Sequence, residues 1–301
     1  MRNQKSECEK LYEVVESGGA EALQAYQKLL CYNTAEAVFY QGLCHFFGHG
    51  VTPVNYEKAF ECHKQTESLG CVNTLYNIGV FYQNACGVPQ NDRQAIVYFE
   101  RVAEQGHDDA MLQLATYYYH GKDVAQNYEK AFELFKKCAE TGNICGVYNL
   151  GICYLKGKGI AQNAKQAVKM FKIAAQQGHS KAEYALGICH HRGEGVTKSF
   201  EKAFEFFKSA ANNGDSDGQC ALGLAYDKGW GIAQNDEKAV ECWTLAAKQN
   251  HAQAQFLLGC AYYCGQGVAV DKWQGKSHIT SSAAQGYELA KQLLKEVKLG
   301  D

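Results

Sequence analysis

The sequence predicts an all-α protein built as an array of about seven helix-pair repeats that stack on one another. Three observations support this fold class. A pattern returns about every 36 residues, each copy holds two segments with helical apolar spacing, and glycine and N-cap residues stand at fixed places between those segments. One helix pair of this size cannot bury its own apolar side, so successive pairs must bury it against each other.

Three columns of residues establish the period. Each recurs seven times in steps of 36, except for one step of 37 that places an extra residue in the VTPVN loop at 51–55. The first column, called the marker, contains Gly42, Gly79, Ala115, Gly151, Gly187, Gly223 and Gly259. The second contains Ala59, Ala95, Ala131, Ala167, Ala203, Ala239 and Gly275, and the third contains Gly70, Gly106, Gly142, Gly178, Gly214, Asn250 and Gly286. Agreement among three independent columns excludes coincidence.

The first helix of each pair, helix A, surrounds the marker. Its apolar residues recur at helical spacing, as in VYNLGICYLKG, and small residues stand five positions before the marker, where they let a neighbouring helix approach closely. A glycine six positions after the marker is expected to end the helix, because glycine readily takes the left-handed conformation found at helix C-termini. This column contains Gly48, Gly121, Gly157, Gly193, Gly229 and Gly265.

The second helix, helix B, opens at a column of good N-cap residues. These side chains can accept a hydrogen bond from the first free backbone N–H groups of the helix. The column contains Asn55, Asn91, Asn127, Asn163, Ser199, Asn235 and Asp271. Helix B then carries large apolar residues such as Phe135, Phe171, Phe207 and Trp243, and it stops at the third column. Each helix is expected to span about 12–14 residues.

The two ends depart from the repeat pattern. Residues 6–31 contain two helical segments separated at Gly18–Gly19, and residues 287–298 form an amphipathic segment. Atypical terminal units are what the exposed core of a repeat array requires. The predicted organisation is therefore N-terminal capping helices at 1–33, a repeat array of seven repeats at 34–286 and a C-terminal capping helix at 287–301.

Composition excludes several classes of protein. The 30 basic and 32 acidic side chains give a net charge of −2, which provides no general attraction to nucleic acid or to an anionic membrane. No apolar run approaches the roughly 20 residues that a membrane helix needs, and residues 1–19 lack the apolar centre of a secretory signal. We therefore expect a cytoplasmic protein without membrane insertion, although export into a host cell by a route that needs no signal stays open.

The combined pattern closely resembles the Sel1-like repeat, a relative of the tetratricopeptide repeat. The pattern reads A-x-x-LG-x-x-Y-x-x-G-x-GV and then KA-x-x-x-F-x-x-AA-x-x-G, and its best match is GVYNLGICYLKGKGIAQNAKQAVKMFKIAAQQG at 146–178. The resemblance covers about residues 35–286 and matches in order, spacing and residue type. Three positions depart from it: Ala115 replaces the marker glycine, Asp123 replaces the second loop glycine, and Gly275 replaces the alanine of the second column.

The resemblance implies a right-handed α/α superhelical solenoid and, for most members, the role of a scaffold or adaptor. It implies no reaction and no cofactor. Some members are secreted by bacteria or act inside host cells, which keeps a bacterial effector that binds a host protein as an alternative. The partner, the source organism and the oligomeric state stay open at this point.

The 14 cysteines raise the question of disulfides. A cysteine-rich subgroup of the Sel1-like family has one disulfide in each repeat at a fixed spacing, but the cysteines here do not hold that register. The nearest candidate pair, Cys138 and Cys145, occurs in one repeat only. Most of the cysteines stand where other repeats have apolar residues, so we expect reduced thiols that pack as small apolar side chains.

Metal binding was tested on the cysteine and histidine clusters. Cys189, His190 and His191 are consecutive, but neighbours in a helix point about 100° apart and cannot converge on one ion. Cys260 and Cys264 share a helix face, yet no histidine accompanies them at zinc-finger spacing. The sequence therefore predicts no metal site.

An enzyme is the alternative from another functional class. Residues 199–202 read SFEK, which matches the S-x-x-K of penicillin-interacting enzymes, and β-lactam binding has been claimed for the cysteine-rich relatives. Ser199, however, belongs to the N-cap column and Lys202 to the repeated EKA segment, and no K-T-G accompanies them. The chain also lacks a P-loop and an H-E-x-x-H motif. We assign no catalytic residue, and a β-lactam-binding or β-lactam-hydrolysing enzyme is kept as an alternative.

Helix A is the expected binding element, because it lines the concave face in related helix-pair solenoids. Positions two before and five after the marker are seven residues apart, so they lie on nearly the same side of the helix. Side chains there vary between repeats while the packing columns stay constant. The residues predicted to bind a partner are Tyr40, Asn77, Asn84, Gln113, His120, Asn149, Lys156, Arg192 and Lys228.

Within this stripe Lys156, Arg192 and Lys228 form a basic row. Such a row suits an acidic or extended peptide segment. The alternative is that these cations only complement the helix dipole at the last turn, which is worth about 0.3–1 kcal/mol and needs no partner. The most favoured function is thus a protein-interaction scaffold or adaptor that binds a protein or peptide, without nucleic acid and without cofactors.

Overall fold

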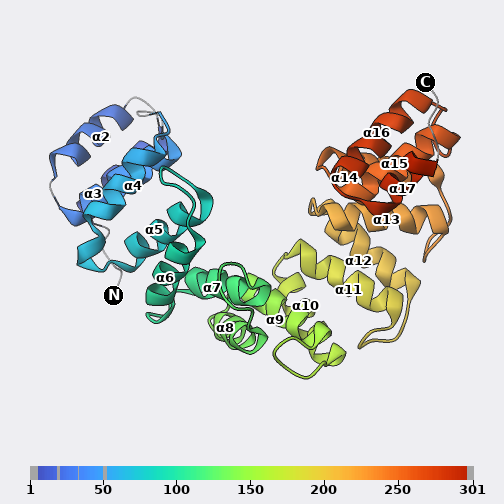
Figure 1. Ribbon diagram of the computed structural model, residues 1–301, viewed down its shortest axis with the longest axis horizontal. Helices are drawn as coiled ribbons and strands as arrows, with labels where there is room; N and C mark the ends of the chain where they lie inside the picture. The colour runs from blue at the N-terminus through green and yellow to red at the C-terminus, as the bar shows by residue number, and fades with distance from the viewer. Residues whose placement is uncertain (1–5, 19–20, 33, 50–52, 297–301) are drawn as a thin grey trace. The chain divides into compact units, whose positions relative to one another are not determined.

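The computed structural model describes residues 6–18, 21–32, 34–49 and 53–296. Over these residues the chain forms seventeen α-helices and one short 3-10 helix, and no strand (Figure 1). The predicted fold class, an all-α repeat solenoid, is confirmed. None of the helices in this described part is long and apolar enough to cross a membrane.

The helices alternate between the two predicted types. Helix A of successive repeats is α3 (Ala35–Phe47), α5 (Val72–Asn84), α7 (Asp108–His120), α9 (Ile144–Lys156), α11 (Ser180–Arg192), α13 (Ser216–Lys228) and α15 (Ala252–Cys264). Helix B is α4 (Tyr56–Gln65), α6 (Asp92–Ala103), α8 (Tyr128–Glu140), α10 (Ala164–Gln176), α12 (Phe200–Asn212), α14 (Asp236–Lys248) and α16 (Lys272–Ala284). Only α4 is clearly shorter than expected, with 10 residues, and a 3-10 turn η1 (Glu67–Leu69) follows it.

The predicted N-caps of helix B are confirmed in all seven repeats. Each side chain accepts a hydrogen bond of 2.8–3.1 Å from the backbone N–H three residues further on. This bond satisfies one of the backbone donors that the first turn of a helix leaves without a partner. The capping residues are Asn55, Asn91, Asn127, Asn163, Ser199, Asn235 and Asp271.

The glycines predicted to end helix A take the left-handed conformation. Gly157, for example, has φ 65° and ψ 41°, and its N–H donates to the carbonyl of Cys153. The second repeat has no glycine at this place, and Ala85 adopts the same conformation there with φ 55°. The repeat therefore imposes the left-handed turn at this position even on alanine, whose Cβ atom makes this conformation unfavourable.

The marker column is small because helix B places its largest buried side chain directly against it. A Cβ atom on Gly187 would lie 2.4 Å from the ring of Phe207, which is 2% exposed. Gly79 meets Phe99 and Gly223 meets Trp243 in the same way. The glycine thus lets helices A and B of one repeat approach within ring contact, as tight helix packing requires.

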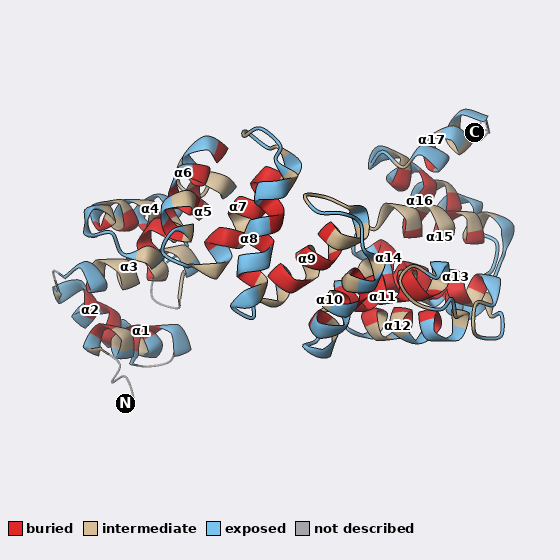
Figure 2. Cartoon of the chain, turned by 90° about the horizontal axis from the view of Figure 1, so that it is seen from below, coloured by how far each residue is buried: buried red, intermediate tan, exposed pale blue. Residues whose placement is uncertain are grey.

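The chain divides into two compact units, 1–141 and 142–301. In the N-terminal unit, α1 (Glu7–Ser17) and α2 (Ala22–Cys31) pack on each other and on α3, and helices α4 to α8 follow. In the C-terminal unit, α9 to α16 are followed by α17 (Glu288–Glu296), which packs on α16. Within each unit, buried residues gather where neighbouring helices face one another, and exposed residues cover the outer sides (Figure 2).

The predicted terminal helices are present as α1, α2 and α17. Their assignment as caps, with boundaries at 33 and 287, stays a prediction. The boundary between the two compact units falls inside the repeat array, after Thr141. Gly19, residues 51–52 of the VTPVN loop and residues 297–301 lie outside the described part of the chain.

Candidate functional site

Two hollows with equivalent linings lie between consecutive A helices, one in each unit, and a further hollow of about 350 Å³ between α3 and α5 is lined by residues that include Tyr40. The α3/α5 hollow has a volume of about 160 Å³ and is lined by Leu43, Phe46, Phe47, His63, Tyr76, Asn77, Val80 and Phe81. The α11/α13 hollow has a volume of about 210 Å³ and is lined by Tyr184, Ile188, His191, Arg192, Phe207, Asp217, Cys220, Ala221, Leu224, Trp230, His251 and Gln253. Each could hold one side chain of a bound segment.

The same repeat positions line both hollows. In the first of the two A helices, the lining residues stand one, four and five positions after the marker. In the next A helix, they stand three and two positions before the marker and one position after it. Two of these positions form the predicted stripe, which brings Phe47 and Asn77 together in one hollow and Arg192 and Ala221 together in the other. The hollow is therefore a property of the repeat, and its chemistry depends on the residues that fill each position.

The other four positions were not among the predicted site residues. Phe46 and His191 stand four after the marker, and Tyr76 and Cys220 stand three before it. The sequence carries a signal for the first position, because its residue types change between repeats as much as those of the predicted stripe do. For the position three before the marker, the sequence signal is Cys220, because the other repeats carry a large apolar residue there.

Several predicted residues make contacts inside the chain. The ring of Tyr40 stacks on that of Tyr12 with a centroid distance of 5.0 Å. Gln113 accepts a 3.0 Å hydrogen bond from the side chain of Gln83, and the Asn149 amide donates a 2.9 Å bond to the backbone carbonyl of Cys145. These polar groups must exchange existing bonds for new ones if a partner binds them, which reduces the net gain of each contact.

The remaining amide and imidazole positions differ in exposure. Asn77 is half-buried, and its amide lies 3.5 Å from Nε2 of His63, at the limit for a hydrogen bond. Asn84 and His120 are exposed at the last turn of their helices, where the His120 ring stands edge-on to Tyr119. Asn84 and His120 line neither of the two hollows.

The basic row of the C-terminal unit is exposed but partly paired. A guanidinium nitrogen of Arg192 lies 3.7 Å from Glu194, and the ammonium group of Lys228 lies 2.9 Å from Asp227. The Arg192–Glu194 pair is exposed on both sides, and such pairs are worth about 0–1 kcal/mol, so Arg192 can turn to a stronger acidic partner at little cost. Lys228 instead pairs with a buried carboxylate, because the Asp227 side chain is only 8% exposed. Lys156 is exposed at the equivalent place in α9.

The cysteine thiols do not form a reactive cluster. None of the fourteen cysteines forms a disulfide, and six of them are buried. Burial raises the pKa of Cys44 and Cys220 to about 12 and that of Cys153 and Cys189 to about 11, so these thiols stay protonated near neutral pH. Over the residues that the structure describes, no group of three His, Cys, Asp or Glu side chains could hold a metal ion.

The S-x-x-K segment has a structural role. The hydroxyl oxygen of Ser199 accepts a 3.1 Å bond from the backbone N–H of Lys202 and donates a 2.8 Å bond to Glu201. The hydroxyl is thus occupied as the N-cap of α12. Both of these hydrogen bonds lie within the first turn of α12, as expected of an N-cap.

Comparison with known proteins identifies the repeats. The model of the Sel1 repeat matches seven consecutive segments, 33–71, 73–107, 108–143, 146–179, 180–215, 216–251 and 252–287. A Sel1 repeat protein from Oxalobacter formigenes is 25% identical, with a TM-score of 0.71, and the match covers 96% of this chain and 86% of that one. A protective antigen of uropathogenic Escherichia coli strains, described as displaying an SLR fold, is 26% identical with a TM-score of 0.71 over 89% of this chain and 57% of the antigen.

Among curated proteins, chitin synthase regulatory factor 2 of Schizosaccharomyces pombe is 32% identical over 77 residues, which make up 26% of this chain. This chain spans only 15% of the length of that factor and 57% of the antigen's length. The two solved structures share with this chain the Sel1-like repeat fold that their descriptions name. Because seven matched segments extend almost continuously from residue 33 to residue 287, the chain belongs to the Sel1 repeat family.

Proposed function

We propose that this protein is an interaction scaffold that holds a partner protein or peptide along the exposed side of its A helices. Sel1 repeat proteins generally mediate protein–protein interaction and are typically non-catalytic. The observation that carries the proposal for this chain is the recurrence of one hollow, at the same repeat positions, in both compact units. A hollow of this kind in each unit suits a guest that inserts a side chain between two consecutive A helices.

Variation among the lining residues supports the same function. The packing columns hold the same small, apolar or capping residues in nearly every repeat, because the fold requires them. The stripe positions instead range from Phe47 and Asn77 to Arg192 and Ala221. Freedom to vary at positions that border a hollow is expected of a surface adapted to one particular guest.

We further propose that the part of the guest that meets the C-terminal unit carries acidic side chains. Lys156, Arg192 and Lys228 occupy the same position in three consecutive repeats and are all exposed. Charges of one sign repeated along a surface attract a segment of opposite charge and fix its register.

The acidic guest can be tested by charge reversal. Replacing Lys156, Arg192 and Lys228 together by glutamate is expected to abolish capture of the partner. Thermal stability should fall only through Lys228, whose ammonium group pairs with the buried Asp227 carboxylate, because Lys156 and Arg192 are exposed and contribute little. The matched control replaces three exposed lysines on the B helices of the same unit, Lys169, Lys172 and Lys208. Equal capture by the two triple variants would contradict the acidic guest.

The scaffold function itself is tested by site-specific photo-crosslinking in an extract of the source cell and, separately, in an extract of a candidate host cell. A photoreactive phenylalanine replaces Gln113 or Lys156 on helix A, and Lys136 or Lys172 on helix B as controls. We expect the same protein to be crosslinked from both helix A positions and from neither helix B position. Mass spectrometry of that adduct identifies the guest, and thereby distinguishes a partner in the same cell from a host protein. Crosslinks that are absent, or equal on both sides, would overturn the scaffold function.

A further inference from the structure

The α11/α13 hollow exists at a place where the repeat lacks a ring. Three positions before the marker, six of the seven repeats carry a large apolar side chain: Phe39, Tyr76, Leu112, Tyr148, Tyr184 and Phe256. The sixth repeat carries Cys220 instead. Cys220 lines the α11/α13 hollow, which is the larger of the two hollows with equivalent linings, whereas the α3/α5 hollow has Tyr76 at this position.

In two other repeats the ring at this position has a defined stacking partner. Tyr76 stacks on His107 and Tyr148 stacks on His179, each with a centroid distance of 4.7 Å and an interplanar angle of 22° or 24°. Both histidines cap the N-terminus of the next helix A through Nδ1. The sixth repeat keeps the histidine as His251, which caps α15 through the same atom.

His251 therefore has the geometry of its counterparts but not their tyrosine. Its Nε2 lies 3.1 Å from the Asp217 carboxylate, which fixes the imidazole in place at the wall of the hollow. The hollow is thus lined by the imidazole of His251, and in two other repeats the equivalent imidazole stacks on the ring of a tyrosine.

Trp230 adds a second aromatic surface to the lining of the hollow. Trp230 stands seven positions after the marker of α13, where other repeats carry His49, Cys86, Lys122, Lys158, Glu194 and Gln266. It packs against His191 with ring centroids 4.4 Å apart. Tyr184 and Phe207 complete an aromatic lining, and Arg192 and Gln253 supply polar groups.

We propose that the α11/α13 hollow binds one aromatic side chain, phenylalanine or tyrosine, from the partner segment, which takes the place of the ring that Cys220 lacks. This inference rests on the proposed scaffold function and names the side chain that the C-terminal unit selects. The volume of about 210 Å³ suits a single ring. An engineered cavity of about 150 Å³ lined by apolar side chains binds benzene, which sets the scale.

The chain fills part of the missing volume by itself. Trp243 stands where other repeats carry Phe99, Phe171 and Phe207, and its larger indole packs in one buried cluster with Cys220. Trp243 is not among the residues that line the hollow. A variant that restores the ring must therefore also reduce Trp243, so the informative replacement is Cys220→Tyr together with Trp243→Phe.

The test measures the binding of small aromatic probes by NMR. The chain contains three tryptophans, so its indole N–H groups give three signals, which single Trp→Phe variants assign. N-acetyltyrosinamide and N-acetylphenylalaninamide are titrated against the full chain, with N-acetylleucinamide as the aliphatic control. We expect a saturable shift of the Trp230 signal in the millimolar range for both aromatic probes and about tenfold weaker binding of the leucine probe. The signal of Trp273, which is 79% exposed, serves as an internal reference.

The filled variant provides the decisive comparison. C220Y/W243F is expected to lose the saturable shift of Trp230, while its thermal midpoint stays equal to that of the natural chain or rises, because filling a cavity removes its cost. If this variant fails to fold, Ala221→Leu adds volume at a residue that lines the hollow and must weaken aromatic binding at least tenfold. Absence of a saturable shift, equal binding of the leucine probe, or unchanged binding to the filled variant would each overturn the proposal.

Failure of this inference can be told apart from failure of the scaffold function. If the probes do not bind but helix A crosslinks to a partner, the aromatic site is wrong and the scaffold stands. If the probes bind but no partner crosslinks, the hollow selects rings and the scaffold function fails.

Discussion

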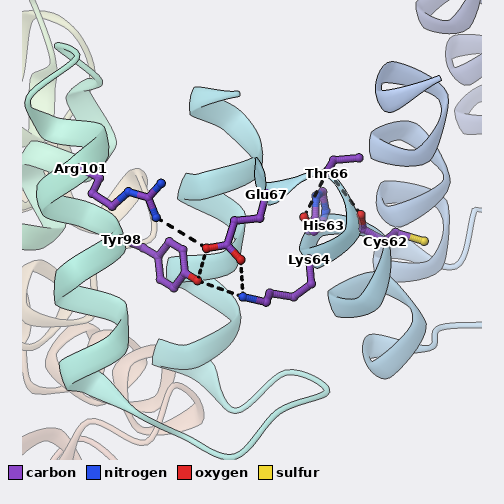
Figure 3. Close-up of polar contacts among 7 residues, drawn as sticks. All are labelled: Cys62, His63, Lys64, Thr66, Glu67, Tyr98 and Arg101. Carbon is purple, nitrogen blue, oxygen red and sulfur yellow. Dashed lines mark hydrogen bonds and ion pairs between the residues drawn. The ribbon is translucent and has the colours of Figure 1, made fainter. Parts of the chain in front are cut away.

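The hydroxyl of Tyr98 donates a 2.6 Å hydrogen bond to the carboxylate of Glu67 (Figure 3). Lys64 also donates to this carboxylate, and Arg101 lies 3.6 Å from it. Glu67 opens the 3-10 turn that follows the shortened α4, and Tyr98 lies in α6. The bond therefore ties the irregular end of the first repeat to helix B of the second.

Tyr98→Phe is expected to lower the free energy of unfolding by about 1 kcal/mol, because it removes a hydrogen bond to a charged group from a side chain that is almost fully buried. Burial raises the pKa of Glu67, but the hydrogen bonds from Lys64 and Tyr98 outweigh it, so the pKa is lowered overall. The contribution is therefore present at neutral pH and is lost as the pH falls below the ordinary pKa of a glutamate. Urea denaturation at pH 7 checks this, with the exposed Tyr56→Phe as control. An equal loss in both variants would contradict it.

His63 makes stability depend on pH between neutrality and mild acid. It is fully buried in α4, and burial lowers its pKa to about 4 from an ordinary value of 6.5. As the pH falls, the unfolded chain therefore binds a proton at His63 before the folded chain does. The stability that the neutral imidazole contributes is fully present above pH 6.5 and is lost as the pH falls toward 4. Other repeats carry phenylalanine at this position of helix B, as in Phe99 and Phe135.

His63→Phe is therefore expected to remove one part of the acid sensitivity. Between pH 7 and pH 5 the free energy of unfolding of the natural chain should fall by about 2 kcal/mol more than that of the variant. Denaturant titrations at the two pH values measure the difference. The exposed His120→Asn serves as the comparison, and it should follow the natural chain at both pH values. A pH dependence unchanged by His63→Phe would show that this imidazole is not the cause.

The repeat columns predicted most helix boundaries, because each column records a local requirement of the backbone. Asn163 caps α10 and Gly157 ends α9 through bonds that involve only neighbouring residues. The early end of α4 was not predicted. There the buried hydroxyl of Thr66 donates to the carbonyl of His63, at a position where other repeats mostly carry apolar residues. Such a side-chain bond competes with the helix only when the surroundings hold the hydroxyl in place.

The site was predicted less completely than the fold. Helical spacing aligned Phe47 with Asn77 across the α3/α5 hollow, because both positions follow from the repeat. The exceptional role of Cys220 could not be predicted, since a small apolar residue leaves a hollow only if its neighbours do not close it. Whether Trp243 fills the space beside Cys220 depends on how the indole packs against its neighbours. One column of the repeat pattern does not encode that packing.

Ala85→Gly is expected to stabilise the N-terminal unit. Ala85 ends α5 in the left-handed conformation, with φ 55°, where the other six repeats carry glycine. This conformation costs a side chain with a Cβ atom about 1 kcal/mol, which glycine avoids. The thermal midpoint should therefore rise, as calorimetry would show. The reverse change in another repeat, Gly157→Ala, should lower it, and a shift of the same sign in both variants would refute the explanation.

Gly187→Ala tests the close approach of helices A and B. The new methyl group would lie 2.4 Å from the ring of Phe207, which real atoms do not tolerate. Because this ring is only 2% exposed and lies directly against α11, the variant should lose about 1–3 kcal/mol of stability. The natural chain contains the comparison: Ala115 occupies the same column in the third repeat and is fully buried there, so a methyl group is tolerated where the neighbours have adjusted.

A second replacement separates this clash from other effects of alanine. Phe207→Leu alone should destabilise the chain by creating a cavity, but in combination with Gly187→Ala it makes room for the new methyl group. The double variant should therefore be more stable than the sum of the two single effects predicts, by about 1 kcal/mol or more in denaturant unfolding. Strict additivity would mean that the glycine is required for its backbone conformation. Since Gly187 lies in the middle of α11 with ordinary helical geometry, we expect the coupling and assign the glycine to the ring that it contacts.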